Sequence, residues 1–252
     1  MSGPDCFTHQ SGRITLIHAM PFSCMMANHL IDWQNVHRHQ LGQTAMSYAR
    51  DEAIRIVEWA LTTISAEESI CAELPFLDAR RKADITIMSP SRLSAIEIKG
   101  SRDNTHSLEQ QITDYQNMFL DVSVATVEKH LQRVRELVPR EVGILLLDPE
   151  GPRLLRKPKN RARLASHSAA RWLSIADLRS LLGSKLVREL GSTSAREHAT
   201  QRISANELSR FALHAVWKRN QGRFHAFINE RGTSGMDLDD LQMLALQQNI
   251  RR

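Results

Sequence analysis

The amino-acid sequence predicts an α/β protein, in which a sheet with crossover helices is followed by a helical C-terminal region. Two strand-like segments and a short turn form an expected hairpin near residue 90. Beyond it, apolar strand-like runs alternate with segments of helical periodicity as far as residue 147. A strand, helix, strand, helix, strand order needs crossover connections, which are typical of α/β sheets.

The N-terminal part is expected to divide into a leader and the first helix of the core. Residues 1–45 show no sustained apolar period, so we expect a poorly structured leader there. From Ser47 to Ile64, apolar residues recur at the three-and-four spacing of one helix face. A second helical piece is expected over Glu67–Leu74, and Pro75 would end it.

The expected core spans residues 46–150. Its hairpin consists of Ala83–Met88 and Leu93–Lys99, joined by the turn Ser89-Pro90-Ser91-Arg92. The following elements are a helix that begins at Asp103 or Asn104 and ends near Phe119, a strand over Val122–Val127, a helix over Glu128–Val138 and a strand over Val142–Leu147. That last strand is almost entirely apolar, as expected for a strand buried on both faces.

The composition changes after the core. Six Lys and Arg residues fall between positions 153 and 163, and we expect residues 151–167 to form a basic linker or hairpin. Residues 168–252 are expected to form a helical C-terminal region. Ser174 with Asp177, and Ser204 with Glu207, have the spacing of helix-start caps.

Composition favours a cytoplasmic protein without a membrane partner. No apolar run is long enough to cross a bilayer, and the N-terminus fits a secretory signal poorly. Three cysteines do not make a disulfide framework. The formal charge of +5 is compatible with nucleic acid or an anionic membrane as a partner, although many basic proteins bind neither.

The hairpin places charged side chains together. Glu97 and Lys99 share one face of their strand, because alternate residues of a strand point the same way. If the turn is symmetric, with Met88 opposite Leu93, Asp84 lies opposite Glu97. Like charges so placed are destabilising, and a divalent cation such as Mg²⁺ between them would explain the arrangement. The alternative is a solvated strand with a surface ion pair, since Glu-x-Lys alone is a weak motif.

The residues around the hairpin resemble a known group of enzymes. The segments Ala83-Asp84-Ile85, Ile96-Glu97-Ile98-Lys99-Gly100-Ser101 and Gln111-x-x-x-Tyr115 resemble the RecB-like branch of the PD-(D/E)XK nuclease superfamily. Within it, residues 70–147 resemble the bacterial "sce" family of uncharacterised nuclease-like proteins. The pattern shared with that family is Arg81-Lys82-Ala83-Asp84, Glu97-Ile98-Lys99, Asp103, Gln111, Tyr115 and Lys129-His130. Ala83 stands where the superfamily often has proline, at a position that varies.

The resemblance implies a restriction-endonuclease-like core with αβββαβ order in a mixed sheet, and phosphodiester hydrolysis that depends on Mg²⁺ or Mn²⁺. It assigns Asp84 and Glu97 as metal ligands and Lys99 as the catalytic lysine. The superfamily often adds a glutamate from the first helix, for which Glu73 is the candidate, with Glu68 second. A solvated helix end is the alternative for Glu73.

The resemblance also assigns two residues of the next helix to the site. Gln111 and Tyr115 are four residues apart and share a helix face, where they are expected to contact substrate or metal-bound water. Tyr115 could instead be a core residue, because it lies in the apolar stripe.

The expected function is a metal-dependent nuclease, with DNA favoured over RNA as substrate. The alternative is a catalytically silent nucleic-acid-binding module of the same fold. The candidate nucleic-acid-binding residues are Ser101, Arg102, Arg156, Lys157, Lys159 and Arg161. A solvated linker is the alternative for the last four, because a charge run alone is usually a solvated surface.

Overall fold

The structure is a computed structural model that describes residues 48–232 and 235–245. All of these residues belong to one compact unit, 42–252. The expected leader, 1–45, lies outside the described residues.

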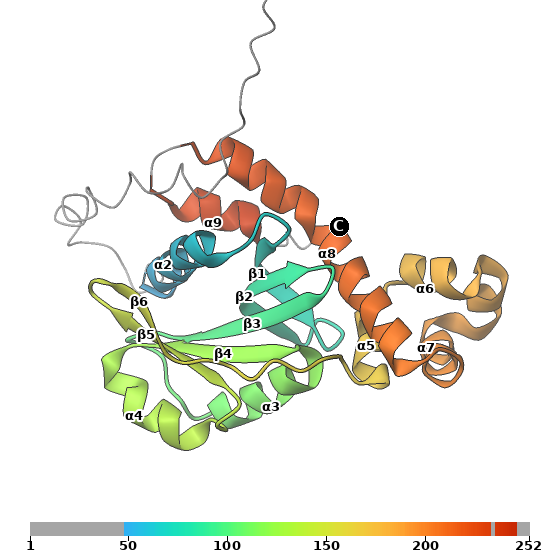
Figure 1. The fold of residues 1–252 in the computed structure, drawn as a ribbon, viewed down its shortest axis with the longest axis horizontal. Coiled ribbons are helices and arrows are strands. Elements are labelled where there is room, and N and C mark those ends of the chain that lie inside the picture. Colours follow the sequence, from blue (N-terminus) through green and yellow to red (C-terminus); the bar gives the residue numbers. More distant parts are fainter. Residues whose placement is uncertain (1–47, 233–234, 246–252) are drawn as a thin grey trace, which may run out of the picture. The chain divides into compact units, whose positions relative to one another are not determined.

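A six-stranded mixed sheet forms the centre of the described residues, with its strands in the order of the chain (Figure 1). The strands are β1 (Ser69–Phe76), β2 (Arg81–Ser89), β3 (Arg92–Lys99), β4 (Asp121–Thr126), β5 (Gly143–Asp148) and β6 (Gly151–Arg156). Neighbours from β1 to β3 are antiparallel, those from β3 to β5 are parallel, and β6 returns antiparallel to β5. The expectation of an α/β protein is therefore confirmed.

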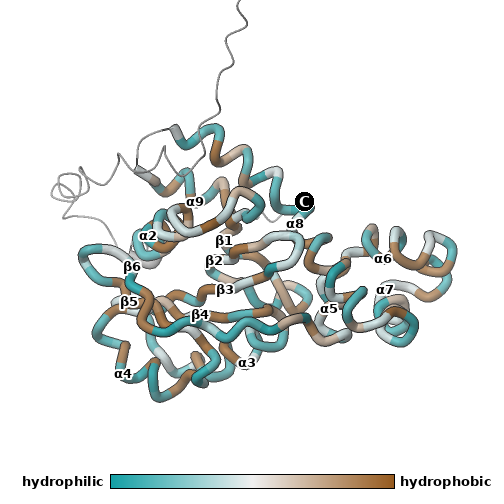
Figure 2. The backbone as a smooth tube through the Cα atoms, in the orientation of Figure 1, coloured by the Kyte–Doolittle hydropathy of each residue, from teal (hydrophilic) through white to brown (hydrophobic). Residues whose placement is uncertain are grey.

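Helices cover both faces of the sheet. They are α2 (Tyr48–Thr63), α3 (Leu108–Met118), α4 (Glu128–Leu137), α5 (Ser166–Trp172), α6 (Ile175–Leu182), α7 (Ser184–Arg202), α8 (Ala205–Glu230) and α9 (Leu238–Leu244). The crossover helices α3 and α4 pack on one face, in a cluster with Leu93 and Val124. Helix α2 packs on the other, with Ile96 and Ile98. Figure 2 shows hydrophobic colour along the central strands between these layers.

Helix α8 connects the two layers at the β1 edge of the sheet. Its first half contributes Leu208 and Val216 to the α3 cluster, and its second half contributes Phe224 and Phe227 to the α2 cluster. The backbone of Ala245 also forms an isolated parallel bridge to β1. An edge strand with unpaired backbone groups invites aggregation, and these contacts cover it.

The helix expected over Glu67–Leu74 is wrong, because this segment forms strand β1. Ile70 and Leu74 are four apart, and a short apolar run of this kind does not distinguish a buried strand from a helix. In the structure Ile70 faces the α2 layer and Leu74 faces the α3 layer, so both faces of the segment are buried. Pairing with β2 along its length, which local spacing does not reveal, decides the outcome.

The C-terminal half also differs in detail from the expectation. Of the two forms expected for residues 151–167, the first six residues form a hairpin strand that extends the sheet, and an irregular segment leads from there to α5. The expected caps are present: Ser174 forms a capping box with Asp177 at α6, and the Ser204 hydroxyl accepts a hydrogen bond from the Glu207 amide at α8. No described helix has both the length and the apolarity required to cross a bilayer.

Candidate active site

The hairpin has the register that a symmetric turn predicts. Met88 pairs with Leu93 and Ile85 pairs with Ile96, so Asp84 comes next on β2, beside Glu97 on β3. Asp84 Oδ2 accepts a hydrogen bond of 2.7 Å from the amide nitrogen of Ile98. The Asp84 carboxylate therefore bonds the β3 backbone directly and is held against the strand that bears Glu97.

Three side chains donate hydrogen bonds to the Glu97 carboxylate. Lys99 Nζ lies 2.8 Å and Gln111 Nε2 lies 2.7 Å from Glu97 Oε1, and the Tyr115 hydroxyl lies 2.7 Å from Oε2. Glu97 is only 3% exposed, and Lys99 is also buried. The solvated-strand alternative is therefore wrong, because this is a buried carboxylate with three side-chain donors rather than a surface ion pair.

Helix α3 presents Gln111 and Tyr115 to the end of β3. The Tyr115 ring packs between Phe76 and Phe119, with ring centroids 5.0 and 5.5 Å away. Its hydroxyl also lies 3.1 Å from the main-chain oxygen of Lys82. The interpretation of Tyr115 as a core residue is confirmed for its ring, and its hydroxyl reaches the Glu97 carboxylate.

The electrostatics of the pair are asymmetric. Burial, and then the neighbouring charge of Glu97, raise the pKa of Asp84 to about 8. The same two causes raise the pKa of Tyr115, so its hydroxyl stays protonated and remains a donor. Glu97 is stabilised by Lys99 and two neutral donors, whereas Asp84 has one backbone donor and a repelling neighbour.

Glu52 of α2 reaches the same strand end and was missed by sequence reasoning. Its carboxylate accepts a hydrogen bond of 3.0 Å from the Ser101 amide and is buried. Burial, with the charge of Asp103 as a lesser cause, raises its pKa. A signal was present, since Glu52 lies four residues before Ile56 and thus on the apolar face of an amphipathic helix, where an acid is unusual.

The two glutamates expected from the first helix lie elsewhere. Glu73 belongs to β1, has a left-handed φ of 51°, and directs an exposed carboxylate to Lys82 at 2.8 Å. Glu68 precedes β1 and pairs with Arg92. The assignment of Glu73 to a helix is wrong, and the buried acid of α2 near the end of β3 is Glu52.

The donor set is suited to a hard divalent cation. Mg²⁺ and Mn²⁺ prefer carboxylate oxygens, and a cation near Asp84 would offset the repulsion that raises its pKa. Within the described residues, no three His, Cys, Asp or Glu side chains converge on one point. Asp84 and Glu97 are the adjacent carboxylates that could hold such a cation, and water and substrate oxygens would have to complete its shell.

Two of the predicted nucleic-acid-binding cations bind the protein itself. Arg156 donates from Nε to the Val142 oxygen at 2.7 Å and from Nη2 to the Pro139 oxygen at 3.0 Å. Arg161 donates to the main-chain oxygens of Gln116 and Phe119 at the end of α3. Both guanidinium groups cap carbonyl groups at the ends of structural elements, which the charge run could not reveal.

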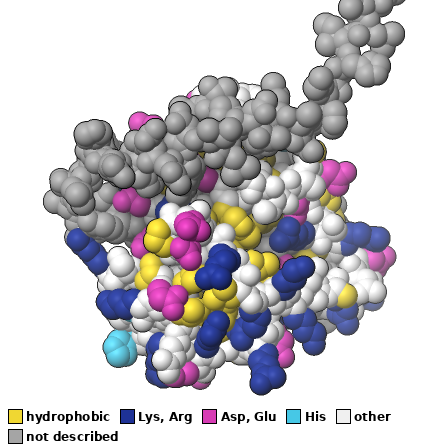
Figure 3. All heavy atoms as spheres, turned by 60° about the vertical axis from the view of Figure 1, so that its left-hand side comes forward, with side chains coloured by type: hydrophobic (Ala, Val, Ile, Leu, Met, Phe, Trp, Pro, Cys, Tyr) yellow, Lys and Arg dark blue, Asp and Glu magenta, His cyan; other side chains and the backbone are white. Residues whose placement is uncertain are grey.

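The other four predicted contacts are exposed. Ser101 and Arg102 follow β3 next to the carboxylates, whereas Lys157 and Lys159 follow β6. Figure 3 shows Lys and Arg side chains spread over the face that it presents, with hydrophobic side chains between them. Of these four residues, Ser101 and Arg102 are the ones closest in the sequence to Glu97 and Lys99.

Comparison with known proteins shows to which family the chain belongs. The family model described as bacteriophage P4 protein cII matches residues 48–245. Protein cII of Enterobacteria phage P4 is 23% identical over 205 residues, which is 76% of this chain and 75% of the phage protein. A solved protein of unknown function from Silicibacter pomeroyi is 18% identical and covers 79% of this chain and 100% of its own, with a TM-score of 0.36. The chain belongs to the bacteriophage P4 protein cII family.

Proposed function

We propose that this protein is a metal-dependent nuclease that hydrolyses phosphodiester bonds, with DNA as the favoured substrate. Asp84 and Glu97 would hold Mg²⁺ or Mn²⁺, and Lys99 would act on the substrate beside them. One observation supports this above all others: two carboxylates and a lysine lie together at the ends of adjacent strands, and the charge of Glu97 is a cause of the high pKa of Asp84.

The arrangement is costly for a purely structural role. Burying carboxylates is unfavourable unless hydrogen bonds and counter-charges compensate, and Asp84 is only partly compensated. Strained electrostatics of this kind are concentrated at functional sites. The α2-β1-β2-β3-α3-β4 order is also the one that the nuclease resemblance implies, and it supports the same conclusion.

The chemistry follows from the residues. Hydrolysis joins a water oxygen to phosphorus and breaks the bond to one bridging oxygen, which leaves as an alcohol after taking up a proton. A bound divalent cation would polarise the phosphoryl oxygens and lower the pKa of a bound water. The Lys99 ammonium would compensate negative charge that develops on the phosphoryl group.

Gln111 and Tyr115 act as positioning residues in this scheme. Each binds one oxygen of Glu97, so together they fix the plane of its carboxylate. The Ser107 hydroxyl donates to Gln111 Oε1 at 3.0 Å, which fixes the amide so that its nitrogen faces Glu97. A rigid carboxylate loses less entropy when it binds a cation.

A nucleic-acid-binding module without activity is the second candidate. It would keep the fold and the exposed Ser101 and Arg102, but it would have no use for the buried acid pair. The test is a nuclease assay on labelled single- and double-stranded DNA and RNA with Mg²⁺ or Mn²⁺. We expect cleavage of DNA by the wild type, and none by Glu97→Gln or Lys99→Ala.

The matched control is Glu73→Gln, which removes an exposed acid that pairs with Lys82 on the same sheet. This variant should cleave as the wild type does. If the wild type binds DNA but cleaves no substrate with either metal, the silent-module candidate replaces the nuclease.

A further inference from the structure

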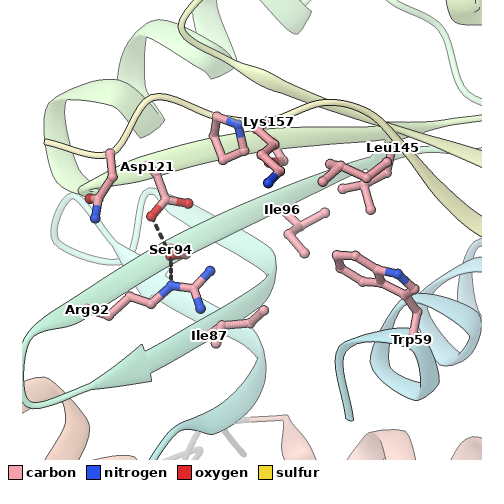
Figure 4. Close-up of a pocket in the computed structure, with 12 residues that line it drawn as sticks. Trp59, Ile87, Arg92, Ser94, Ile96, Asp121, Leu145 and Lys157 are labelled. Carbon is pink, nitrogen blue, oxygen red and sulfur yellow. Dashed lines mark hydrogen bonds between the residues drawn. The ribbon is translucent and has the colours of Figure 1, made fainter. Parts of the chain in front are cut away.

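A pocket of about 310 Å³ lies on the sheet face turned away from Glu97 (Figure 4). Neighbouring residues of a strand point to opposite faces, so Ile96 lines this pocket while Glu97 faces α3. Strands β2 to β6 all contribute side chains to it, and α2 contributes Trp59. The pocket is thus separated from the candidate nuclease site by the thickness of the sheet.

One end of the pocket is a built polar network. The Ser94 hydroxyl donates to Asp121 Oδ2 at 2.6 Å, and Arg92 Nε donates to the Ser94 oxygen at 2.7 Å. Glu68, which does not line the pocket, pairs with Arg92 and restrains its guanidinium group. Ser94 is 2% exposed and Asp121 is 7% exposed, so the network is held in place within the fold.

The other end is apolar and aromatic. Figure 4 shows the Trp59 indole facing the side chains of Ile96 and Leu145 across the pocket. Lys157, from the segment after β6, is exposed and extends its ammonium group into the space between the two ends. The pocket therefore combines an apolar and aromatic end, a carboxylate acceptor and a cation.

The charges of the polar residues nearly cancel. Arg92 is neutralised by Glu68, which leaves the carboxylate of Asp121 and the ammonium of Lys157 for a ligand. Burial raises the pKa of Asp121, because the Ser94 hydrogen bond and Arg92 compensate its desolvation only in part. A ligand that donates a hydrogen bond to this carboxylate would supply part of the missing compensation.

The geometry points to a binding site for a small planar heteroaromatic molecule with an amino or ring N–H donor and an anionic group, in the class of nucleoside monophosphates. The ring would lie against Trp59, its donor would bond Asp121, and its anion would face Lys157. Aromatic side chains are common platforms for nucleobases. The volume lies at the small end of the range for ligand pockets. This inference does not depend on nuclease activity.

The test is isothermal titration calorimetry of the full chain in EDTA. The probes are the 5′-monophosphates of adenosine, guanosine, cytidine and uridine, and the four parent nucleosides. EDTA removes divalent metal, so binding at Asp84 and Glu97 does not contribute. We expect at least one monophosphate to bind with a Kd below about 1 mM.

Three variants locate the ligand. Lys157→Gln should weaken binding of the monophosphate by roughly tenfold, which corresponds to a loss of about 1.4 kcal/mol for one charge contact. It should leave the affinity for the nucleoside unchanged, because the nucleoside has no phosphate. Lys159→Gln is the matched control, because this exposed lysine does not line the pocket, and it should change neither. Trp59→Leu should weaken both ligands.

The proposal is overturned if no monophosphate binds the wild type, or if Lys157→Gln and Lys159→Gln have equal effects. Lys157 is exposed, so its variant should keep the fold and the outcome does not rest on a buried substitution. Nucleotide binding without cleavage would support this site and contradict the proposed nuclease function. Cleavage without nucleotide binding would support the nuclease function and contradict this site.

Discussion

The Glu52 carboxylate fills the space beside Gly100 in which any other residue would place a Cβ. An ideal Cβ built on Gly100 would stand 1.9 Å from Glu52 Oε2, far closer than two such atoms can approach. Gly100 is therefore required at the end of β3 for a side chain of α2 to bond Ser101. This contact connects the first helix to the strand that bears Glu97 and Lys99.

Replacing Gly100 with alanine should displace Glu52 without unfolding the protein, because the clash is with the far end of a flexible side chain. We expect a loss of about 1 kcal/mol of stability, the value of one hydrogen bond, and a fall in the rate of the proposed nuclease reaction. The measurement is a double-mutant cycle with Glu52→Ala. Additive effects of the two substitutions would show that Gly100 and Glu52 are not coupled.

Replacing Asp84 with asparagine should stabilise the metal-free protein at high pH. A pKa raised from about 4 in the unfolded chain to about 8 means that the folded state binds more protons between these values. Wild-type stability in EDTA should therefore fall as pH rises from about 4 to 8, and Asp84→Asn should flatten that fall. Thermal melts across this range decide the point, and parallel curves for both proteins would contradict the assignment.

Glu97→Gln should not stabilise the metal-free protein as Asp84→Asn does. The hairpin alone suggests that removing either charge ends the repulsion, but Glu97 also accepts hydrogen bonds from Lys99, Gln111 and Tyr115. An amide would leave the Lys99 ammonium buried without its counter-charge, which destabilises. We expect Glu97→Gln to melt below Asp84→Asn in EDTA. The reverse order would show that the Lys99 contact contributes little.

Divalent metal should stabilise the wild type and have little effect on either acid variant. A ligand that binds only the folded state raises the melting temperature by mass action. Lys99→Ala should keep this metal response while it loses cleavage, because it removes no oxygen ligand. Melts with millimolar Mg²⁺ and Mn²⁺ test this, with Glu73→Gln as the acid variant that should respond fully. Equal responses of wild type and Glu97→Gln would exclude Glu97 as a ligand.

Tyr115→Phe should keep the packing of the ring and remove only its hydroxyl. The lost hydrogen bond to a charged acceptor should cost about 1.5 to 3 kcal/mol. Tyr115→Leu should cost more, since contacts with Phe76 and Phe119 are also lost. Denaturant melts give both values, and a harmless Tyr115→Phe would show that the hydroxyl contributes no net stability.

Arg156→Gln should lower stability, whereas Lys159→Gln should not. Arg156 bonds two main-chain oxygens, so its loss leaves acceptors without a partner, while Lys159 is exposed. The comparison is made by thermal melts, and Arg153→Gln serves as an exposed arginine control on the same hairpin. If Arg156→Gln and Arg153→Gln have the same melting temperature, the contacts of Arg156 with the two carbonyl groups contribute no net stability.

The sequence determined the parts of this protein that depend on near neighbours. The turn between Ser89 and Arg92 sets the hairpin register, and the period of two in β3 puts Glu97 and Lys99 on one face. The three-and-four spacing in α3 brings Gln111 and Tyr115 to one side. Ser174 and Ser204 begin α6 and α8. Each of these follows from backbone geometry within a few residues.

The tertiary structure decided what depends on residues far apart in the chain. β1 is a strand because β2 pairs with it, although its apolar spacing also fits a helix. Glu52 bonds Ser101, which follows β3 and lies 49 residues further along the chain. Arg161 bonds the main-chain oxygens of Gln116 and Phe119 at the end of α3, 45 and 42 residues before it. The Trp59 pocket needs six separate elements. Such contacts arise only when the sheet is assembled, because periodicity records which face of an element is apolar and not what that face will meet.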